Sequence, residues 1–165
     1  METALDTELD ALSAEVGDAL LRRGWMLATA ESCTGGWIAE VVTATSGSSA
    51  WFDRGFVTYS NAAKVDMLGV HQGTLDAHGA VSEATVAEMA EGALAHSVSD
   101  VSIAVSGVAG PTGGTPAKPV GMVCLAWAQR GRPTHVRTCH FSGDRHAVRR
   151  QTVIHALREL IGLSH

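Results

Sequence analysis

Hydrophobic residues follow two alternating spacings in the first part of the chain. Over residues 9–21 they recur every three or four positions, as on one face of a helix, and Gly24 ends this pattern. Residues 25–30 form a short continuous apolar run, which suits a buried strand. Helical spacing returns over residues 36–45, until a Ser-Gly-Ser-Ser segment breaks it. This part of the chain is therefore predicted to fold as helix, strand and helix.

Strands and helices continue to alternate farther along, and a hairpin follows. Ser82 is a natural N-cap for a helix that ends near His96, and the segment from His71 to Gly79 is predicted to be a polar linker. A turn at residues 130–133 joins the two strands of the hairpin. The other predicted elements are strands over residues 52–60, 100–106, 120–129 and 133–141, a short helix over 61–68, and a last helix from Asp144 to about Leu160.

This order of elements predicts the fold class. Early strands joined by helices are typical of a parallel sheet, whereas a late hairpin adds an antiparallel pair. We therefore expect an α/β fold, a three-layer α/β/α sandwich with a mixed, mainly parallel sheet. The chain has 165 residues and shows no internal repeat or interdomain linker, so one domain over residues 1–165 is expected.

Composition narrows the class of protein. The longest apolar runs are far shorter than the roughly 20 residues that cross a bilayer, and the first residues are acidic where a signal peptide is basic. We expect a cytoplasmic protein that does not bind a membrane. Its net charge of −5, without any block of basic residues, argues against nucleic acid as a partner. A small molecule is the expected ligand.

Familiar metal and cofactor motifs are missing from the sequence. Cys33, Cys124 and Cys139 are an odd number without CxxC spacing, so neither a disulfide framework nor a zinc site is predicted. The eight histidines are scattered, and the glycine-rich segments match neither a P-loop nor GxGxxG. We expect no metal and no cofactor.

The segment ESCTGG, residues 31–36, is the main candidate for chemistry because it lies at a predicted junction of strand and helix. A hydroxyl or thiol there lies close to free backbone N–H groups, which favour negative charge. The N–H groups of Thr34, Gly35 and Gly36 could hold an oxyanion, and the glycines let a substrate approach. Spacing does not choose between Ser32, Cys33 and Thr34 as nucleophile, and Ser32 or Thr34 could equally be a simple helix cap.

A serine nucleophile needs a base, and Lys64 is the best placed candidate. It follows the second predicted strand, and adjacent parallel strands end at the same edge of a sheet, where α/β proteins bind ligands. A partly buried lysine can lose its proton and act as a base. Glu31 and a histidine are alternative bases, and Ser60 is a rival nucleophile one helical turn before Lys64. The alternative for Lys64 is a solvated helix lysine.

Two further segments are candidates for binding an anionic substrate. The first is the glycine- and proline-rich loop over residues 107–119, where Ser106, Gly107 and Gly110 could contact a phosphate or sugar, although such loops are often only turns. The second is the start of the last helix, where Arg145 and Arg149 lie one turn apart. A cationic pair at this position suggests either an anionic ligand or salt bridges on the surface.

Long motifs covering about residues 9–160 closely resemble the CinA C-terminal domain family. They include TAESCTGGWIAEVVTATSGSSAWFDRGFVTYSNAAK, SGVAGPTGGTPAKPVGMV and GDRHAVRRQ. The resemblance implies a metal-free amidohydrolase that converts nicotinamide mononucleotide to nicotinate mononucleotide and ammonia in pyridine nucleotide salvage. It also implies that Ser32 is the nucleophile and Lys64 its base. Tyr59 and Asn61, in the same motif as Lys64, are then expected to orient that lysine or to contact the substrate.

Two alternatives to a serine amidohydrolase stay open at this point. Some members of the family could be non-catalytic nucleotide-binding or protein-interaction modules, of the kind that the names competence and damage-inducible suggest. A cysteine amidohydrolase that uses Cys33 is the other. A small domain with exposed apolar helices could also form a homo-oligomer, and a dimer is the expected one.

Overall fold

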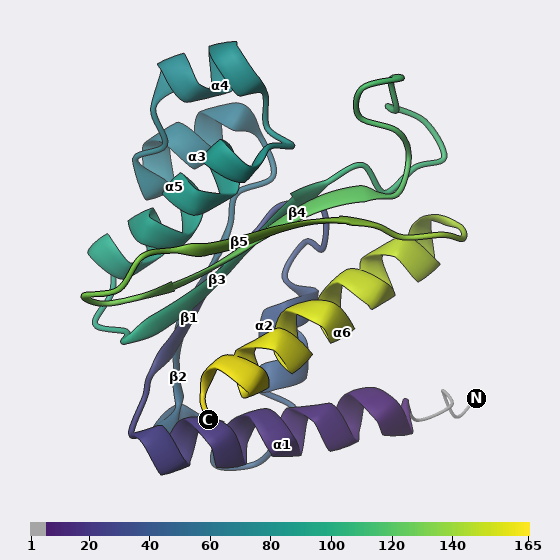
Figure 1. Cartoon of the computed structure of the whole chain (residues 1–165). Coiled ribbons are helices and arrows are strands. Elements are labelled where there is room, and N and C mark those ends of the chain that lie inside the picture. The colour runs from purple at the N-terminus through teal and green to yellow at the C-terminus, as the bar shows by residue number, and fades with distance from the viewer. Residues whose placement is uncertain (1–5) are drawn as a thin grey trace.

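A five-stranded mixed sheet forms the centre of the computed structural model, which describes residues 6–165. Residues 1–5 lie outside the described residues, and they include part of the acidic segment that argues against a signal peptide. The strands lie in the order β2-β1-β3-β4-β5 (Figure 1). β1 pairs in parallel with β2 and β3, whereas β4 pairs antiparallel with β3 and β5. The strand bounds are β1 Leu27–Glu31, β2 Phe52–Val57, β3 Val101–Gly107, β4 Met122–Gln129 and β5 His135–His140.

The mixed sheet is confirmed, and most of its strands run in the same direction, as predicted. Four of the five strands run the same way and β4 runs opposite to them, although the four pairings divide into two parallel and two antiparallel ones. β1 therefore has a parallel neighbour on each side, as the site at its end requires.

Helices cover both faces of the sheet, which confirms the three-layer α/β/α fold (Figure 1). Each helical layer has its own apolar core: Leu20, Ile38 and Leu157 belong to one cluster, and Leu68 and Met89 belong to the other. The first layer comprises α1 (Thr7–Arg23), α2 (Trp37–Val42) and α6 (Arg145–Leu163). The second comprises α3 (Asn61–Leu68), α4 (Gln72–His78) and α5 (Glu83–Ala95).

Predicted helix ends agree with the structure where a capping residue marks them. Gly24 ends α1 in the left-handed conformation, with φ of 65°. The side chain of Ser82 accepts a hydrogen bond from the N–H of Thr85, and that of Asp144 accepts one from Ala147. The helix predicted over residues 36–45 is shorter and ends at Val42.

The polar linker predicted from His71 to Gly79 is wrong, because residues 72–78 form α4. This helix buries only Leu75, and hydrogen bonds to Glu88 in α5 stabilise it. The Glu88 carboxylate accepts hydrogen bonds from the His71 N–H at 2.8 Å and from the Thr74 hydroxyl at 2.5 Å. A tertiary contact therefore stabilises a segment whose own sequence has a weak helical pattern.

Cys33, Cys124 and Cys139 are free thiols. Within residues 6–165, each helix is too short or too polar to cross a membrane.

Candidate active site

The candidate site lies where β1 and β2 end side by side. Their parallel pairing continues beyond the strands, as the Thr58 N–H donates to the Glu31 carbonyl at 2.9 Å. Ser32 directly follows β1, and Lys64 lies in the first turns of α3, which follows β2. The expectation that both residues lie at one edge of the sheet is confirmed.

Lys64 contacts Ser32 directly. Its Nζ lies 3.1 Å from Ser32 Oγ, 2.8 Å from the Thr58 carbonyl oxygen and 3.3 Å from that of Tyr59. The lysine is 1% exposed and forms no ion pair with any carboxylate in residues 6–165. The expectation of a solvated helix lysine is therefore wrong.

Burial lowers the pKa of Lys64, because a charged ammonium loses its hydration there. A neutral amine has two N–H hydrogens and one lone pair. The carbonyls of Thr58 and Tyr59 can accept the two hydrogens, which leaves the lone pair for the hydroxyl proton of Ser32. This arrangement suits a general base.

A hollow of about 220 Å³ lies beside this pair and gives access to it. Ser106 and Gly107, at the end of β3, line the hollow together with Ala109 from the following loop. The Ser106 side chain makes no hydrogen bond to any residue from 6 to 165. Two of the three loop residues predicted to contact a ligand therefore lie at the hollow.

The other candidate nucleophiles have different roles. Burial raises the pKa of the Cys33 thiol to about 11, so it is protonated near neutral pH and poorly reactive. The Ser60 hydroxyl caps α3 by accepting a hydrogen bond from the Ala63 N–H at 3.0 Å, and the Thr34 hydroxyl donates to Glu31 at 2.5 Å. Ser32 alone among these four has the lysine amine within hydrogen-bond distance.

Glu31 supports the start of α2 and is not a base for Ser32. Its carboxylate accepts hydrogen bonds from the N–H groups of Ile38 at 2.8 Å and Ala39 at 3.1 Å, besides that from Thr34. Burial raises the pKa of Glu31, while these donors oppose the shift. The sequence offered no clear signal for this role, because the donors come from the next turn of the chain.

Gly35 shapes the turn instead of offering its N–H group to an oxyanion, which corrects the prediction for that residue. The Gly35 N–H donates to the Ser32 carbonyl at 3.0 Å, and the backbone of Gly36 is among the groups that oppose the rise in the pKa of Glu31. The φ values of the two glycines, 61° and 105°, lie in the left-handed region that favours glycine. The N–H groups of Cys33 and Thr34 have no acceptor in residues 6–165.

Tyr59 contributes mainly through its backbone. Its carbonyl oxygen accepts from Lys64, whereas its side chain is 62% exposed and its hydroxyl lies 3.3 Å from Arg145 Nη2. The ring therefore lies at the rim of the hollow and does not orient the lysine. Asn61 is the exposed first residue of α3 and lies outside the hollow.

The two arginines of α6 differ in their position relative to the hollow. Arg145 lines the hollow and donates to the Gly110 carbonyl at 2.9 Å, which also ties that loop glycine to the site. Arg149 lies outside the hollow and donates to the carbonyls of Cys33 at 3.0 Å and Thr34 at 3.1 Å. The prediction of Arg149 as a ligand-binding residue is therefore not supported, since only Arg145 of the two lines the hollow.

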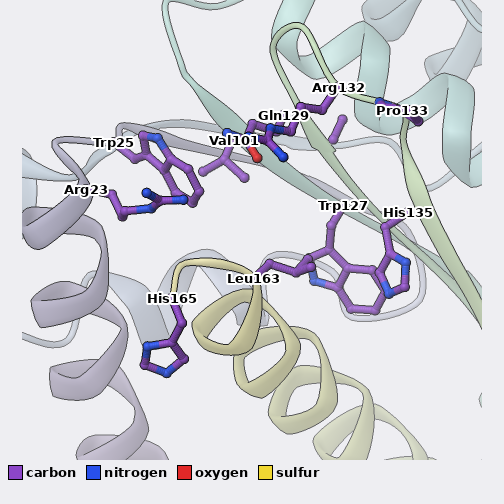
Figure 2. Close-up of a pocket in the computed structure, with 11 residues that line it drawn as sticks. Arg23, Trp25, Val101, Trp127, Gln129, Arg132, Pro133, His135, Leu163 and His165 are labelled. Atoms are coloured by element: carbon purple, nitrogen blue, oxygen red, sulfur yellow. The ribbon is translucent and has the colours of Figure 1, made fainter.

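A second hollow, of about 320 Å³, lies at the opposite end of the sheet (Figure 2). The Arg23 guanidinium lies 4.7 Å from the centre of the Trp25 ring, and the rings of Trp127 and His135 are 5.3 Å apart. None of the residues that line it is a serine, cysteine or lysine. It therefore offers no counterpart of the Ser32–Lys64 pair.

Comparison with known proteins gives strong matches over most of the chain. The family described as the CinA C-terminal domain matches residues 9–163. The nicotinamide-nucleotide amidohydrolase PncC of Escherichia coli strain K12 is 57% identical over 156 residues, which are 94% of each chain. A putative competence-damage inducible protein of Symbiobacterium thermophilum is 53% identical, over 90% of this chain but 37% of its own length.

Solved structures show the same fold. The competence/damage inducible protein CihA of Agrobacterium tumefaciens aligns with a TM-score of 0.95 at 43% identity. The alignment covers 99% of this chain and 100% of that one.

Proposed function

Because the chain belongs to the CinA C-terminal domain family, we propose that it is a nicotinamide-nucleotide amidohydrolase that uses Ser32 and Lys64. Its substrate is nicotinamide mononucleotide, and its products are nicotinate mononucleotide and ammonia. The observation that carries this proposal is the buried Lys64 amine, 3.1 Å from the Ser32 hydroxyl at the wall of a hollow. The name of the 57% identical relative supports the choice of substrate.

The first step is attack of Ser32 on the carboxamide carbon. Neutral Lys64 takes the hydroxyl proton as the bond between Oγ and carbon forms, and the π electrons of the carbonyl move to its oxygen. The N–H groups of Cys33 and Thr34 follow Ser32 in the chain and have no acceptor in residues 6–165, so they are the donors available to stabilise this oxygen. The result is a tetrahedral intermediate next to a protonated lysine.

The second step releases ammonia and the third releases the product. Lys64 gives its proton to the amide nitrogen, the carbon–nitrogen bond breaks, and an ester to Ser32 remains. Lys64 is then neutral again and accepts a proton from water as the water attacks the ester. Return of that proton to Ser32 Oγ completes the cycle, so one lysine is base and acid in turn.

Arg145 is the candidate for the phosphate of the substrate. It is exposed at the rim of the hollow, and its guanidinium has no carboxylate partner in residues 6–165. Guanidinium groups bind phosphate through paired hydrogen bonds. In the cell this reaction returns the amide nucleotide to pyridine nucleotide salvage in the cytoplasm.

The test is ammonia release from nicotinamide mononucleotide by the purified protein. Ser32→Ala and Lys64→Ala should each lower turnover by at least about 10³-fold, because the nucleophile or its base is lost. Ser49→Ala is the matched control, since that serine is exposed and its hydroxyl makes no hydrogen bond in residues 6–165. Unchanged turnover in Ser32→Ala would contradict the dyad.

The same assay distinguishes an enzyme from a non-catalytic module. If the wild-type protein binds the nucleotide tightly but releases neither ammonia nor nicotinate mononucleotide, the amidohydrolase proposal is wrong and the module is favoured.

A further inference from the structure

We infer that Arg149 is a positioning residue, which holds the peptide between Cys33 and Thr34 so that the Thr34 N–H can donate a hydrogen bond to the oxyanion. The inference rests on the proposed function, because the oxyanion arises when Ser32 attacks a carbonyl carbon. Arg149 does not line the hollow, so it acts through the backbone of the turn and not on the substrate.

The contacts of Arg149 are unusual for a half-buried arginine. Its Nε donates to the Cys33 carbonyl at 3.0 Å and its Nη2 donates to the Thr34 carbonyl at 3.1 Å. Its guanidinium lies 5.7 Å from the centre of the Trp37 ring, and it forms no ion pair within residues 6–165. The planar group therefore bridges two consecutive carbonyls, which the single ammonium of a lysine could not match in geometry.

Peptide geometry connects these contacts to the Thr34 N–H. The peptide between Cys33 and Thr34 is trans, so its carbonyl and its N–H point in opposite directions. Arg149 on the carbonyl side therefore fixes an N–H that points away from it. A hydrogen bond to the carbonyl also polarises the peptide, which makes the N–H a stronger donor.

The Thr34 N–H is unpaired although Thr34 is only 1% exposed. The preceding Cys33 N–H also has no acceptor in residues 6–165, whereas the Gly35 N–H is used within the turn by the Ser32 carbonyl. Buried N–H groups without an acceptor are rare in folded proteins. An unpaired donor two residues from the nucleophile is what a developing oxyanion would complete.

Arg149→Gln tests the inference, with Arg150→Gln as the matched control. Arg150 is the next residue, but it pairs with Asp6 and Glu8 on the surface. Arg149→Gln should lower kcat for nicotinamide mononucleotide by about 10- to 100-fold, somewhat less than direct loss of an oxyanion donor. KM should change less than about threefold, because substrate binding is unaffected. Arg150→Gln should keep the wild-type kcat.

A second measurement separates positioning from a general structural role. Pyridine-3-boronic acid adds to a serine hydroxyl as a tetrahedral anion, so it needs the oxyanion site. Its affinity should fall in Arg149→Gln by about the same factor as kcat/KM. In contrast, adding Arg149→Gln to Ser32→Ala should leave the affinity for nicotinamide mononucleotide unchanged.

Equal losses of boronate and nucleotide affinity, or a wild-type kcat in Arg149→Gln, would overturn the inference. If Arg149→Gln does not fold, Arg149→Lys keeps the charge and should still lose boronate affinity; full affinity there would also overturn it. A wild-type protein that binds the boronate but does not hydrolyse the nucleotide would contradict the proposed function alone. The boronate comparison would then decide the role of Arg149.

Discussion

At the scale of single residues, the state of Lys64 decides whether the site can work. An ammonium in that position would have three N–H donors and no lone pair, so it could not accept the proton of Ser32. Burial favours the neutral amine, and the carbonyls of Thr58 and Tyr59 hold it in place. Removing the Lys64 amine from water costs stability, but it also favours the neutral form that a base requires.

The pH dependence of kcat/KM should report this amine. Activity requires the neutral form, so kcat/KM rises with pH through the pKa of Lys64 and is constant above it. Because burial lowers that pKa, we expect the plateau to begin below the usual lysine value of 10.5. The measurement is a pH–rate profile with nicotinamide mononucleotide.

Lys64→Arg is the control for this profile. A guanidinium stays protonated and cannot act as a base, so the variant should be inactive at every pH although it keeps the positive charge. Activity in Lys64→Arg, or a wild-type profile that still rises at pH 10.5, would show that Lys64 is not the base.

At the scale of elements, the position of α3 depends on a glycine in α5. Gly92 packs against the end of α3, and a Cβ atom built on it would lie 2.0 Å from the Leu68 carbonyl oxygen. Leu68 is one helical turn beyond Lys64, on the same short helix. Close contact of the two helices therefore sets the distance from Lys64 to Ser32.

Gly92→Ala should destabilise the protein and slow the reaction. Alanine favours a helix by about 0.5–1 kcal/mol over glycine, but overpacking against backbone costs about 1–3 kcal/mol or more, so the clash dominates. Gly73→Ala in α4 is the matched control: nothing lies within 4 Å of its added Cβ, and its stability and turnover should be unchanged or slightly raised. Urea unfolding and ammonia release measure both effects. Equal stability of the two variants would argue against the helix contact.

The sequence predicts those helices whose ends are marked by a capping residue of their own. Gly24, Ser82 and Asp144 mark helix ends within a few residues of each cap, and the fold class followed from the order of strands and helices. The helix α4 was missed because Glu88, which holds it, lies in another helix. Periodicity within a short polar segment contains no information about such a partner.

The sequence predicts the part of the site whose position is set by two neighbouring strands. Ser32 follows β1 and Lys64 lies in the helix that follows the adjacent parallel strand β2, so their meeting follows from the sheet. Arg149 was assigned to a ligand because its contacts with residues 33 and 34 span more than 100 positions of sequence. Nor could the sequence show that the Gly35 N–H is already paired.

At the scale of the whole molecule, distant parts of the chain converge on one hollow. Ser32 follows β1, Lys64 lies in α3, Ser106 and Gly107 lie at the end of β3, and Arg145 begins α6. Figure 1 shows these elements. A ligand that touches all of them should stabilise the fold as a unit, because it binds the folded state only.

Ser32→Ala, which cannot turn over its ligand, is suited to measure this. At about one hundred times Kd, nicotinamide mononucleotide should add about 2.7 kcal/mol and raise Tm by roughly 5–10 °C. Free nicotinamide at the same concentration should raise it much less, because it lacks the phosphate. Adding Arg145→Ala should remove most of the nucleotide effect and leave that of nicotinamide; equal shifts for both ligands would contradict a phosphate site at Arg145.

The hollow has one further consequence, for protein engineering. One contiguous stretch, residues 31–64, encodes both reacting side chains, whereas other walls of the hollow come from residues 80–81, from the end of β3 and the loop after it, and from α6. Libraries confined to residues 80, 81, 109 and 145 are therefore expected to vary which amide is accepted while Ser32 and Lys64 stay unchanged.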